Sequence, residues 1–136
     1  MLFRETTQQD LGYMKDNSVS RGILNKQPER TDFCYSLEHE GILLGIGGIR
    51  LINLTTAWCW VDMTADAKKH TIIVYRVIKE WMDKLVEEKG LKRLQAYIAL
   101  DFPEAIRMIQ HLGFHKEGIL KNFIGNKDAS LYVNLF

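Results

Sequence analysis

Residues 56–100 pass from a strand pattern to a long helix pattern and back to a strand pattern, and this order constrains the fold more than any other feature. The stretches 56–63 and 91–100 are strand-like, and a strand at 56–63 places Trp58, Trp60 and Asp62 on one face. Between them, over residues 66–88, apolar side chains recur at helical spacing: Ile73, Val74, Val77, Ile78, Trp81, Met82, Leu85 and Val86. Two strands joined by a crossover helix run parallel, so the sequence predicts a β-α-β unit.

The remaining patterns predict mostly antiparallel neighbours for that unit. In chain order they are a strand at 2–5, a helix from Thr7 to about Asp16, a short helix at 19–26, a hairpin turning at Glu40–Gly41, a helix within 102–113 and a final hairpin turning at Gly125–Asn126. No linker or repeat divides the chain. We therefore expect residues 1–136 to form a single α/β domain, with a mixed, mostly antiparallel central sheet and flanking helices.

Composition excludes several classes of function. The net charge is +1, from 18 basic and 17 acidic residues without a block of one sign, so we expect no nucleic-acid partner. The N-terminus has no apolar signal region, and no apolar run approaches membrane-spanning length, so we expect a cytoplasmic protein without a membrane partner. Cys34 and Cys59 lie in apolar strands and are expected to be buried thiols. The histidines are dispersed, and no metal site is predicted.

Three glycines in the segment LLGIGGI have two interpretations. Gly45, Gly47 and Gly48 resemble a nucleotide-binding loop in composition alone. They fall inside an apolar strand pattern, and no helix pattern follows them. A bulge or bend in a strand is therefore the better interpretation.

Two segments near the C-terminus resemble a known family. They are EAIRMIQHLGFHKEG at 104–118 and GNKDASLYVNL at 125–135, and with the element order they resemble the GNAT superfamily of acetyl-CoA-dependent acyltransferases. The matching residues are Ala105, Leu112, Gly113, Phe114, Glu117, Gly118, Asp128, Leu131 and Tyr132. The resemblance implies a splayed parallel strand pair, at about 56–64 and 92–99, whose gap admits the pantetheine of acetyl-CoA.

The same resemblance implies a cofactor-binding site. The backbone near Met63 and Thr64 would pair with the pantetheine amides, and the start of the long helix would hold the pyrophosphate. That start contains Lys68, Lys69, His70, Thr71 and Ile72.

The helix start departs from the family pattern, because DAKKHTII has neither of the glycines that the family usually has there. A side chain at Thr71 or Ile73 narrows the approach of a phosphate to the backbone, whereas the three basic side chains could offset this by direct charge. Cations at a helix start oppose the helix dipole, which favours a bound anion over a merely solvated turn. Asp66 is an alternative partner for these cations, and it could also cap the helix.

Candidate catalytic residues follow from the chemistry of amine acetylation. A general base has to lie close to the nucleophilic nitrogen. Asp62, at the end of the strand, is the first candidate, with His39 and Glu38 behind it, and the resemblance implies the backbone amide of Met63 as the oxyanion donor. Tyr132 is the candidate proton donor for the leaving thiolate, because Ile109 stands where many GNAT proteins have a tyrosine.

Trp58 and Trp60 alternate on the strand face that also carries Asp62. Core packing is one interpretation of this face, and a wall of the substrate site is the other. Tyr97 also has two interpretations: its ring packs in the protein, or its hydroxyl is a second candidate proton donor.

The leading hypothesis is an acetyl-CoA-dependent N-acyltransferase that uses acetyl-CoA as cosubstrate and a small amine or protein amine as acceptor. The alternative is a non-catalytic GNAT-fold structural or interaction protein, because the glycine-free loop and the tail resemble small GNAT-like proteins of phages and prophages. That alternative predicts a cleft filled by side chains such as Ile72 or a tryptophan. The apolar C-terminal LYVNLF suggests an edge strand that pairs across a homodimer.

Overall fold

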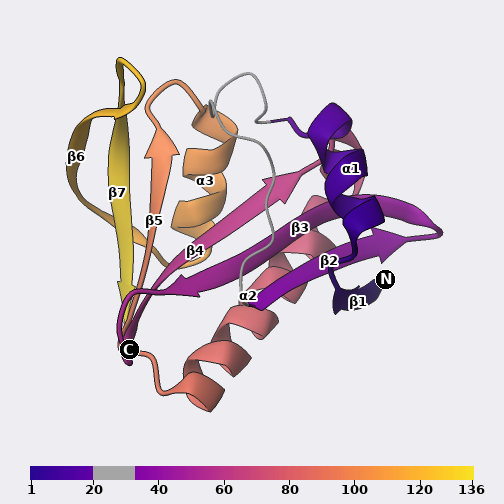
Figure 1. Cartoon of the computed structure of the whole chain (residues 1–136), viewed down its shortest axis with the longest axis horizontal. Coiled ribbons are helices and arrows are strands. Elements are labelled where there is room, and N and C mark those ends of the chain that lie inside the picture. The colour runs from indigo at the N-terminus through magenta and orange to yellow at the C-terminus, as the bar shows by residue number, and fades with distance from the viewer. Residues whose placement is uncertain (20–32) are drawn as a thin grey trace. The chain divides into compact units, whose positions relative to one another are not determined.

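The computed structural model describes residues 1–19 and 33–136 of the chain. The strands are β1 (Leu2–Glu5), β2 (Phe33–His39), β3 (Ile42–Leu51), β4 (Thr56–Met63), β5 (Arg93–Ala99), β6 (His115–Ile124) and β7 (Lys127–Leu135). The helices are α1 (Gln8–Asn17), α2 (Thr71–Lys89), α3 (Pro103–His111) and the 3-10 helix η1 (Ala65–His70). Figure 1 shows their arrangement along the chain.

The strands form one sheet in the order β1-β2-β3-β4-β5-β7-β6. β4 and β5 are parallel and pair at Thr56–Arg93, Ala57–Leu94 and Trp58–Gln95. The pairs β1–β2, β2–β3, β5–β7 and β6–β7 are antiparallel. The predicted fold class, a mixed and mostly antiparallel sheet with helices, is confirmed.

The chain divides into two compact units. The first contains residues 1–50 and 59–71, and the second contains residues 51–58 and 72–136. The expected single domain stays a prediction, and each unit is described separately below.

The core of the first unit joins α1 to β3 and β4. Buried Met14 packs with Leu43 and Ile46, and Leu11 and Trp60 pack against this cluster. Trp60 therefore has the core-packing role that was one of its two interpretations. A capping box starts α1, in which Asp10 N–H donates to Thr7 Oγ1 and Thr7 N–H donates to Asp10 Oδ2.

The turns predicted from glycine are confirmed in both units. Glu40 and Gly41 join β2 to β3 in a two-residue hairpin turn. Their φ angles are 52° and 78°, and this type of turn needs a positive φ at both residues. Gly125, with φ of 62°, lies between β6 and β7. Gly113, with φ of 93°, follows α3.

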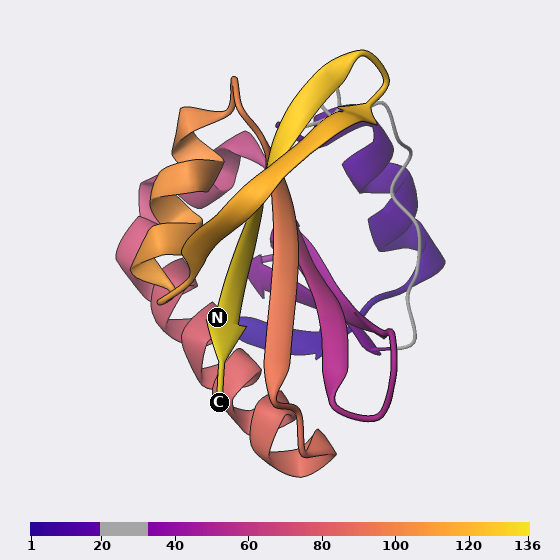
Figure 2. The ribbon, with the colours of Figure 1, turned by 90° about the vertical axis from the view of Figure 1, so that its left-hand side faces the viewer.

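In the second unit, α2 and α3 lie on the same side of β5, β7 and β6 (Figure 2). Helix α2 buries one face, formed by Val74, Ile78, Trp81, Met82 and Leu85. No helix in residues 1–19 or 33–136 combines the length and the apolar character that a membrane span requires.

Two sequence expectations are wrong, and a third cannot be compared. The C-terminal segment is not an edge strand, because β7 is hydrogen-bonded to β5 on one side and to β6 on the other. The turn at Gly125 reverses the chain, so β6 is the strand at the edge. The long α-helix begins at Thr71 and not near Asp66, because residues 65–70 form η1. The helix expected at 19–26 lies outside the described residues, apart from Val19, which is a turn residue.

Candidate functional site

The end of β4 and the turn after it bring most of the predicted site residues together in the first unit. Asp62 and Met63 end β4, Thr64 follows, and Lys68, Lys69 and His70 lie in η1. Thr71 is the last residue of this unit. Ile72 and Tyr132 belong to the second unit.

Thr64 fixes the end of β4 against β3. Its N–H donates to the carbonyl of Leu44 at 2.9 Å, and its hydroxyl donates to the carbonyl of Leu43 at 3.0 Å. The Thr64 carbonyl accepts from Ala67 N–H at 3.2 Å, which opens the 3-10 turn. Thr64 is only 2% exposed, so its side chain is a structural anchor of the strand end.

Two glycines of β3 show which backbone groups of β4 face β3. A Cβ at Gly45 would lie 2.7 Å from the carbonyl oxygen of Asp62, and one at Gly47 would lie 3.0 Å from that of Trp60. Both glycines are therefore required by the close approach of two strands, and a β2–β3 register shift beside Gly45 fits the predicted bulge. Backbone groups alternate in direction along a strand, so the N–H and carbonyl of Met63 face the opposite edge of β4.

This opposite edge is already paired at Met63. Val19 N–H donates to the Met63 carbonyl at 2.9 Å, and Ser18 and Thr64 form an antiparallel bridge. Ser18 Oγ also donates a short hydrogen bond to Asp62 Oδ1. Ser18 and Val19 were not predicted as site residues, because residues that follow a helix carry no sequence signal for the strand that they will contact.

Two basic side chains of η1 are exposed, and part of its backbone is bonded within the turn. Residue Lys69 is exposed, and its Nζ lies 3.5 Å from Asp66 Oδ1, a weak contact between exposed groups. Lys68 is also exposed. In a 3-10 helix each N–H bonds to the carbonyl three residues earlier, as Ala67 does to Thr64, so the amides within η1 point along the helix. An anion at this turn would therefore be held mainly by side chains.

The two alternative bases have other partners. Glu38 Oε1 accepts from Arg4 Nε at 3.3 Å. The ring of His39 contacts that of His70 edge to face, with centroids 4.7 Å apart. Asp62 also has a partner, Ser18 Oγ, and it stays the first candidate because of its place at the end of β4, next to Met63.

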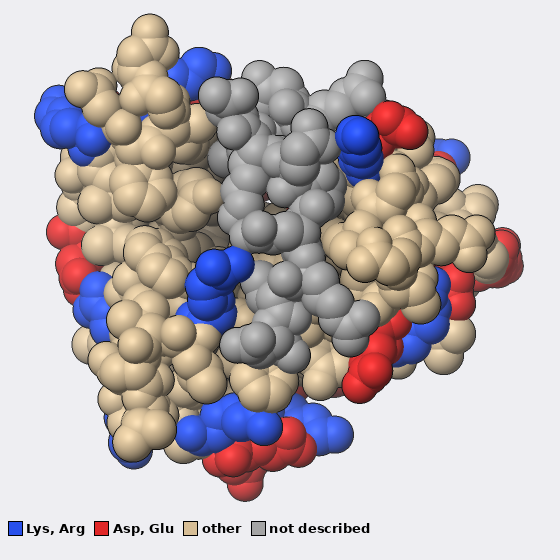
Figure 3. Space-filling model, in the orientation of Figure 1, with Lys and Arg blue, Asp and Glu red and all other residues tan. Residues whose placement is uncertain are grey.

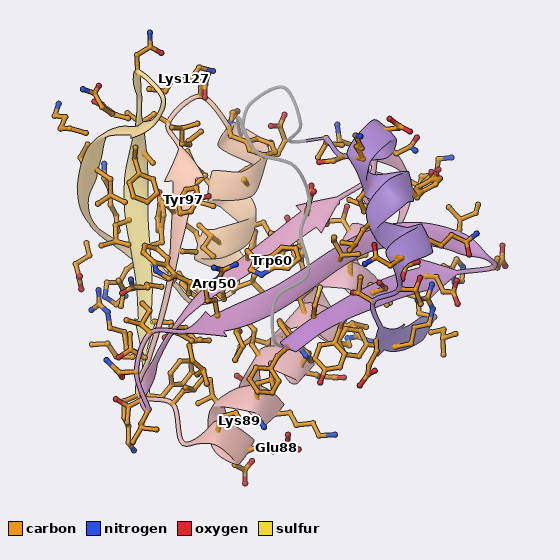
Figure 4. The ribbon with its side chains drawn as sticks, in the orientation of Figure 1. Arg50, Trp60, Glu88, Lys89, Tyr97 and Lys127 are labelled. Atoms are coloured by element: carbon orange, nitrogen blue, oxygen red, sulfur yellow. The ribbon has the colours of Figure 1, made fainter. Side chains whose placement is uncertain are left out.

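Tyr132 is buried in the second unit, at 4% exposure, where it pairs with Ala96 in the β5–β7 ladder. Ile109, in the place of the family tyrosine, is also buried. The ring of Tyr97 (labelled in Figure 4) packs against Phe123 at 4.7 Å and against Trp58 at 5.9 Å. Tyr97 and Trp58 therefore show the packing interpretation that the sequence left open.

Ile72 does not fill a cleft in this structure, since it is 75% exposed at the start of α2. At the other end of α2, Glu88 and Lys89 are neighbours (Figure 4), and acidic and basic side chains lie together there in the surface view (Figure 3). The basic turn of η1 thus differs in charge from the far end of the helix that it precedes.

No metal centre is found in the described ranges, which hold no group of three or more His, Cys, Asp or Glu residues able to bind an ion. Cys34 and Cys59 are free and buried. Burial raises the pKa of the Cys59 thiol to about 12, so this thiol is not a nucleophile at neutral pH.

Comparison with solved structures identifies the fold as that of GNAT acetyltransferases. A variant of the spermidine N-acetyltransferase SpeG from Vibrio cholerae is similar over 99% of this chain and 95% of its own, with a TM-score of 0.78 and 17% identity. Ribosomal-protein-alanine N-acetyltransferase from Brucella melitensis is similar over 100% of both chains, with a TM-score of 0.75 and 17% identity. A GNAT-family acetyltransferase from Bacillus anthracis covers 98% of this chain and 93% of its own, with a TM-score of 0.77 and 16% identity.

No protein-family profile matches the chain, and no curated protein matches it in sequence. At the identities above, the structural similarity establishes the fold alone. Activity and substrate are argued next from the site.

Proposed function

We propose that this protein is an N-acetyltransferase that transfers the acetyl group of acetyl-CoA directly to a primary amine. The observation that carries the proposal is a GNAT fold over nearly the whole chain, with an exposed basic turn directly after β4. Spermidine and ribosomal-protein alanine are the acceptors named for two of the similar structures. A small amine or a protein amine is therefore the acceptor class that we propose here.

Residues of the first unit fit a CoA thioester in part. Lys68 and Lys69 supply cationic side chains for the pyrophosphate and His70 supplies a ring N–H, which favours binding by side chains over a backbone cradle. Thr71 is less suited to this role, because its hydroxyl already donates to the Lys68 carbonyl at 3.0 Å. Met63 supplies the backbone edge for the pantetheine, and Thr64 holds that edge in place. Ile72 would contribute only an exposed apolar side chain beside the turn.

Acetyl-CoA supplies the acetyl group and a thiolate leaving group, and the protein supplies acid-base chemistry and orientation. Asp62 accepts a proton from the bound ammonium, directly or through a water, and the neutral amine then attacks the acetyl carbonyl. The Met63 amide polarises the acetyl carbonyl. Tyr132 is the proposed proton donor to the thiolate, and its burial means that it acts only if bound ligand reaches it.

A second candidate is a non-catalytic structural or interaction protein of this fold, such as the phage-like proteins that the sequence resembles. The pairing of Val19 with Met63 favours it, because the chain itself uses the edge that a cofactor needs. Ile72 is exposed and so is not a side chain that fills a cleft, although this candidate also allows a tryptophan in that place.

Release of free thiol from acetyl-CoA in the presence of acceptor amines distinguishes the two. We expect amine-dependent thiol release, with an acetylated amine detected by mass spectrometry, when polyamines, amino-sugar antibiotics and peptides with free N-termini are supplied. The test variant replaces Lys68 and Lys69 together by glutamate, which should weaken acetyl-CoA binding and slow the reaction at low cofactor concentration. Thiol release no faster than in the absence of the protein, whichever amine is supplied, would support the non-catalytic candidate.

A further inference from the structure

Residues Ser18 and Val19 make contacts that the proposed function does not use. They follow α1 directly, and Ser18 N–H donates to the Met14 carbonyl at 3.0 Å, which ties the segment to the helix end. From there the segment runs in an extended conformation, with Ser18 at φ −67° and ψ 133°. It reaches the end of β4 and forms an antiparallel bridge with it.

The bridge occupies a specific edge of β4. Thr64 N–H bonds to Leu44 on β3, whereas the Met63 carbonyl points the other way and accepts from Val19. Near its start, β4 pairs with β5 in parallel, at Thr56 to Trp58. At Met63 the partner is instead the chain's own Val19.

The bridge also engages the proposed base. Ser18 is 7% exposed, and its hydroxyl donates to the carboxylate of Asp62, one residue before Met63. A carboxylate held by a buried hydroxyl is less available to accept a proton from an amine. One dipeptide thus occupies the proposed cofactor edge and the proposed base together.

We propose that Ser18 and Val19 form a strap that closes this edge in the free protein and is released when a CoA thioester binds. This inference rests on the proposed function, and it adds a coupling between cofactor binding and exposure of the base. The amides of the pantetheine arm offer the same donor as Val19 N–H, so the two compete for the Met63 carbonyl. Competition of this kind lowers the apparent affinity for the cofactor by the fraction of open protein.

Val19→Pro tests the strap, because proline has no N–H to donate to Met63. The extended conformation of Ser18 suits a residue before proline. The matched control is Val19→Ala, which keeps the N–H and shortens a side chain that is 37% exposed. We expect the proline variant to bind CoA about 10-fold more tightly than wild type, the effect of one competing backbone hydrogen bond, and the alanine variant to bind as wild type does.

Amide hydrogen exchange in the wild-type protein gives a second test that needs no variant. The Val19 amide should be protected in the free protein and should lose protection at saturating CoA. Unchanged or increased protection with CoA bound would overturn the strap.

The outcomes separate the strap from the proposed function. Equal CoA affinity in wild type, Val19→Pro and Val19→Ala would overturn the strap and leave the cofactor proposal standing. Absence of CoA binding in all three would overturn both. Binding by the proline variant alone would support both, and would show that the strap keeps the free protein closed.

Discussion

Asp62→Asn is expected to slow acetyl transfer by about 100- to 1,000-fold, the usual contribution of a general base. Asparagine keeps an oxygen that can accept the Ser18 hydrogen bond, so the end of β4 should retain its structure. The affinity for acetyl-CoA should change little, because Asp62 acts on the amine. The rate should be measured at saturating acetyl-CoA as a function of pH, since a base-deficient enzyme recovers as solvent deprotonates the amine.

Asp83→Asn is a suitable control, because Asp83 is an exposed carboxylate of α2 whose partner is Lys79, at 2.7 Å. Its rate should equal that of wild type. An Asp62→Asn rate within about threefold of wild type would contradict the role of Asp62 as a base, since a general base contributes far more than this.

Asp10→Ala is expected to lower the free energy of unfolding by about 3 kcal/mol, because it removes one partner of a largely buried ion pair. Asp10 is 6% exposed and accepts two hydrogen bonds from Arg4, at 2.6 Å and 3.0 Å. It also accepts from Ser36 Oγ at 2.8 Å and from Thr7 N–H at 2.9 Å. The variant removes this acceptor, although Arg4 still donates to Glu38 and Ser36 still donates to Thr6 Oγ1. Urea unfolding followed by tryptophan fluorescence measures the cost.

The control is Asp83→Ala, which breaks an exposed pair on a helix and should cost less than about 0.5 kcal/mol. A loss below about 1 kcal/mol for Asp10→Ala would mean that the network is not an important source of stability, since typical single substitutions already cost this much.

The same network predicts the response of stability to acid. Burial alone raises the pKa of Asp10, but hydrogen bonds from Arg4, Thr7 N–H and Ser36 outweigh it and hold the pKa well below its usual 3.8. The unfolded chain therefore binds this proton first, so the stabilisation is complete above about pH 5 and declines as the pH falls below the usual value. Asp10→Asn should be less stable than wild type at neutral pH, and the difference should shrink in acid.

Much of the fold could be predicted from the sequence because local signals agree with the final structure. The strand at 56–63 was located by its strand-like composition, and the turns at Gly41, Gly113 and Gly125 by the need for positive φ. The parallel pair followed from the crossover helix alone. The edge position of the C-terminal strand was predicted wrongly, because the order of strands in a sheet depends on contacts between distant segments.

The candidate site was less predictable for two physical reasons. The spacing of apolar residues does not distinguish a 3-10 turn from the first turn of an α-helix, so the start of α2 was placed too early. The Ser18–Asp62 bond joins residues 44 positions apart, and no periodic pattern indicates such a pair. The cause of the glycines at 45 and 47, the close approach of β3 to β4, also became visible only in three dimensions.

The central claim is that the basic turn after β4 holds a CoA thioester, and isothermal titration with CoA and acetyl-CoA tests it most directly. Saturable heat with one site per chain is expected for the wild-type protein. Replacing Lys68 and Lys69 by glutamate should weaken binding and make it less dependent on salt. The claim would be contradicted if wild type and Val19→Pro both gave no heat of binding at near-millimolar ligand.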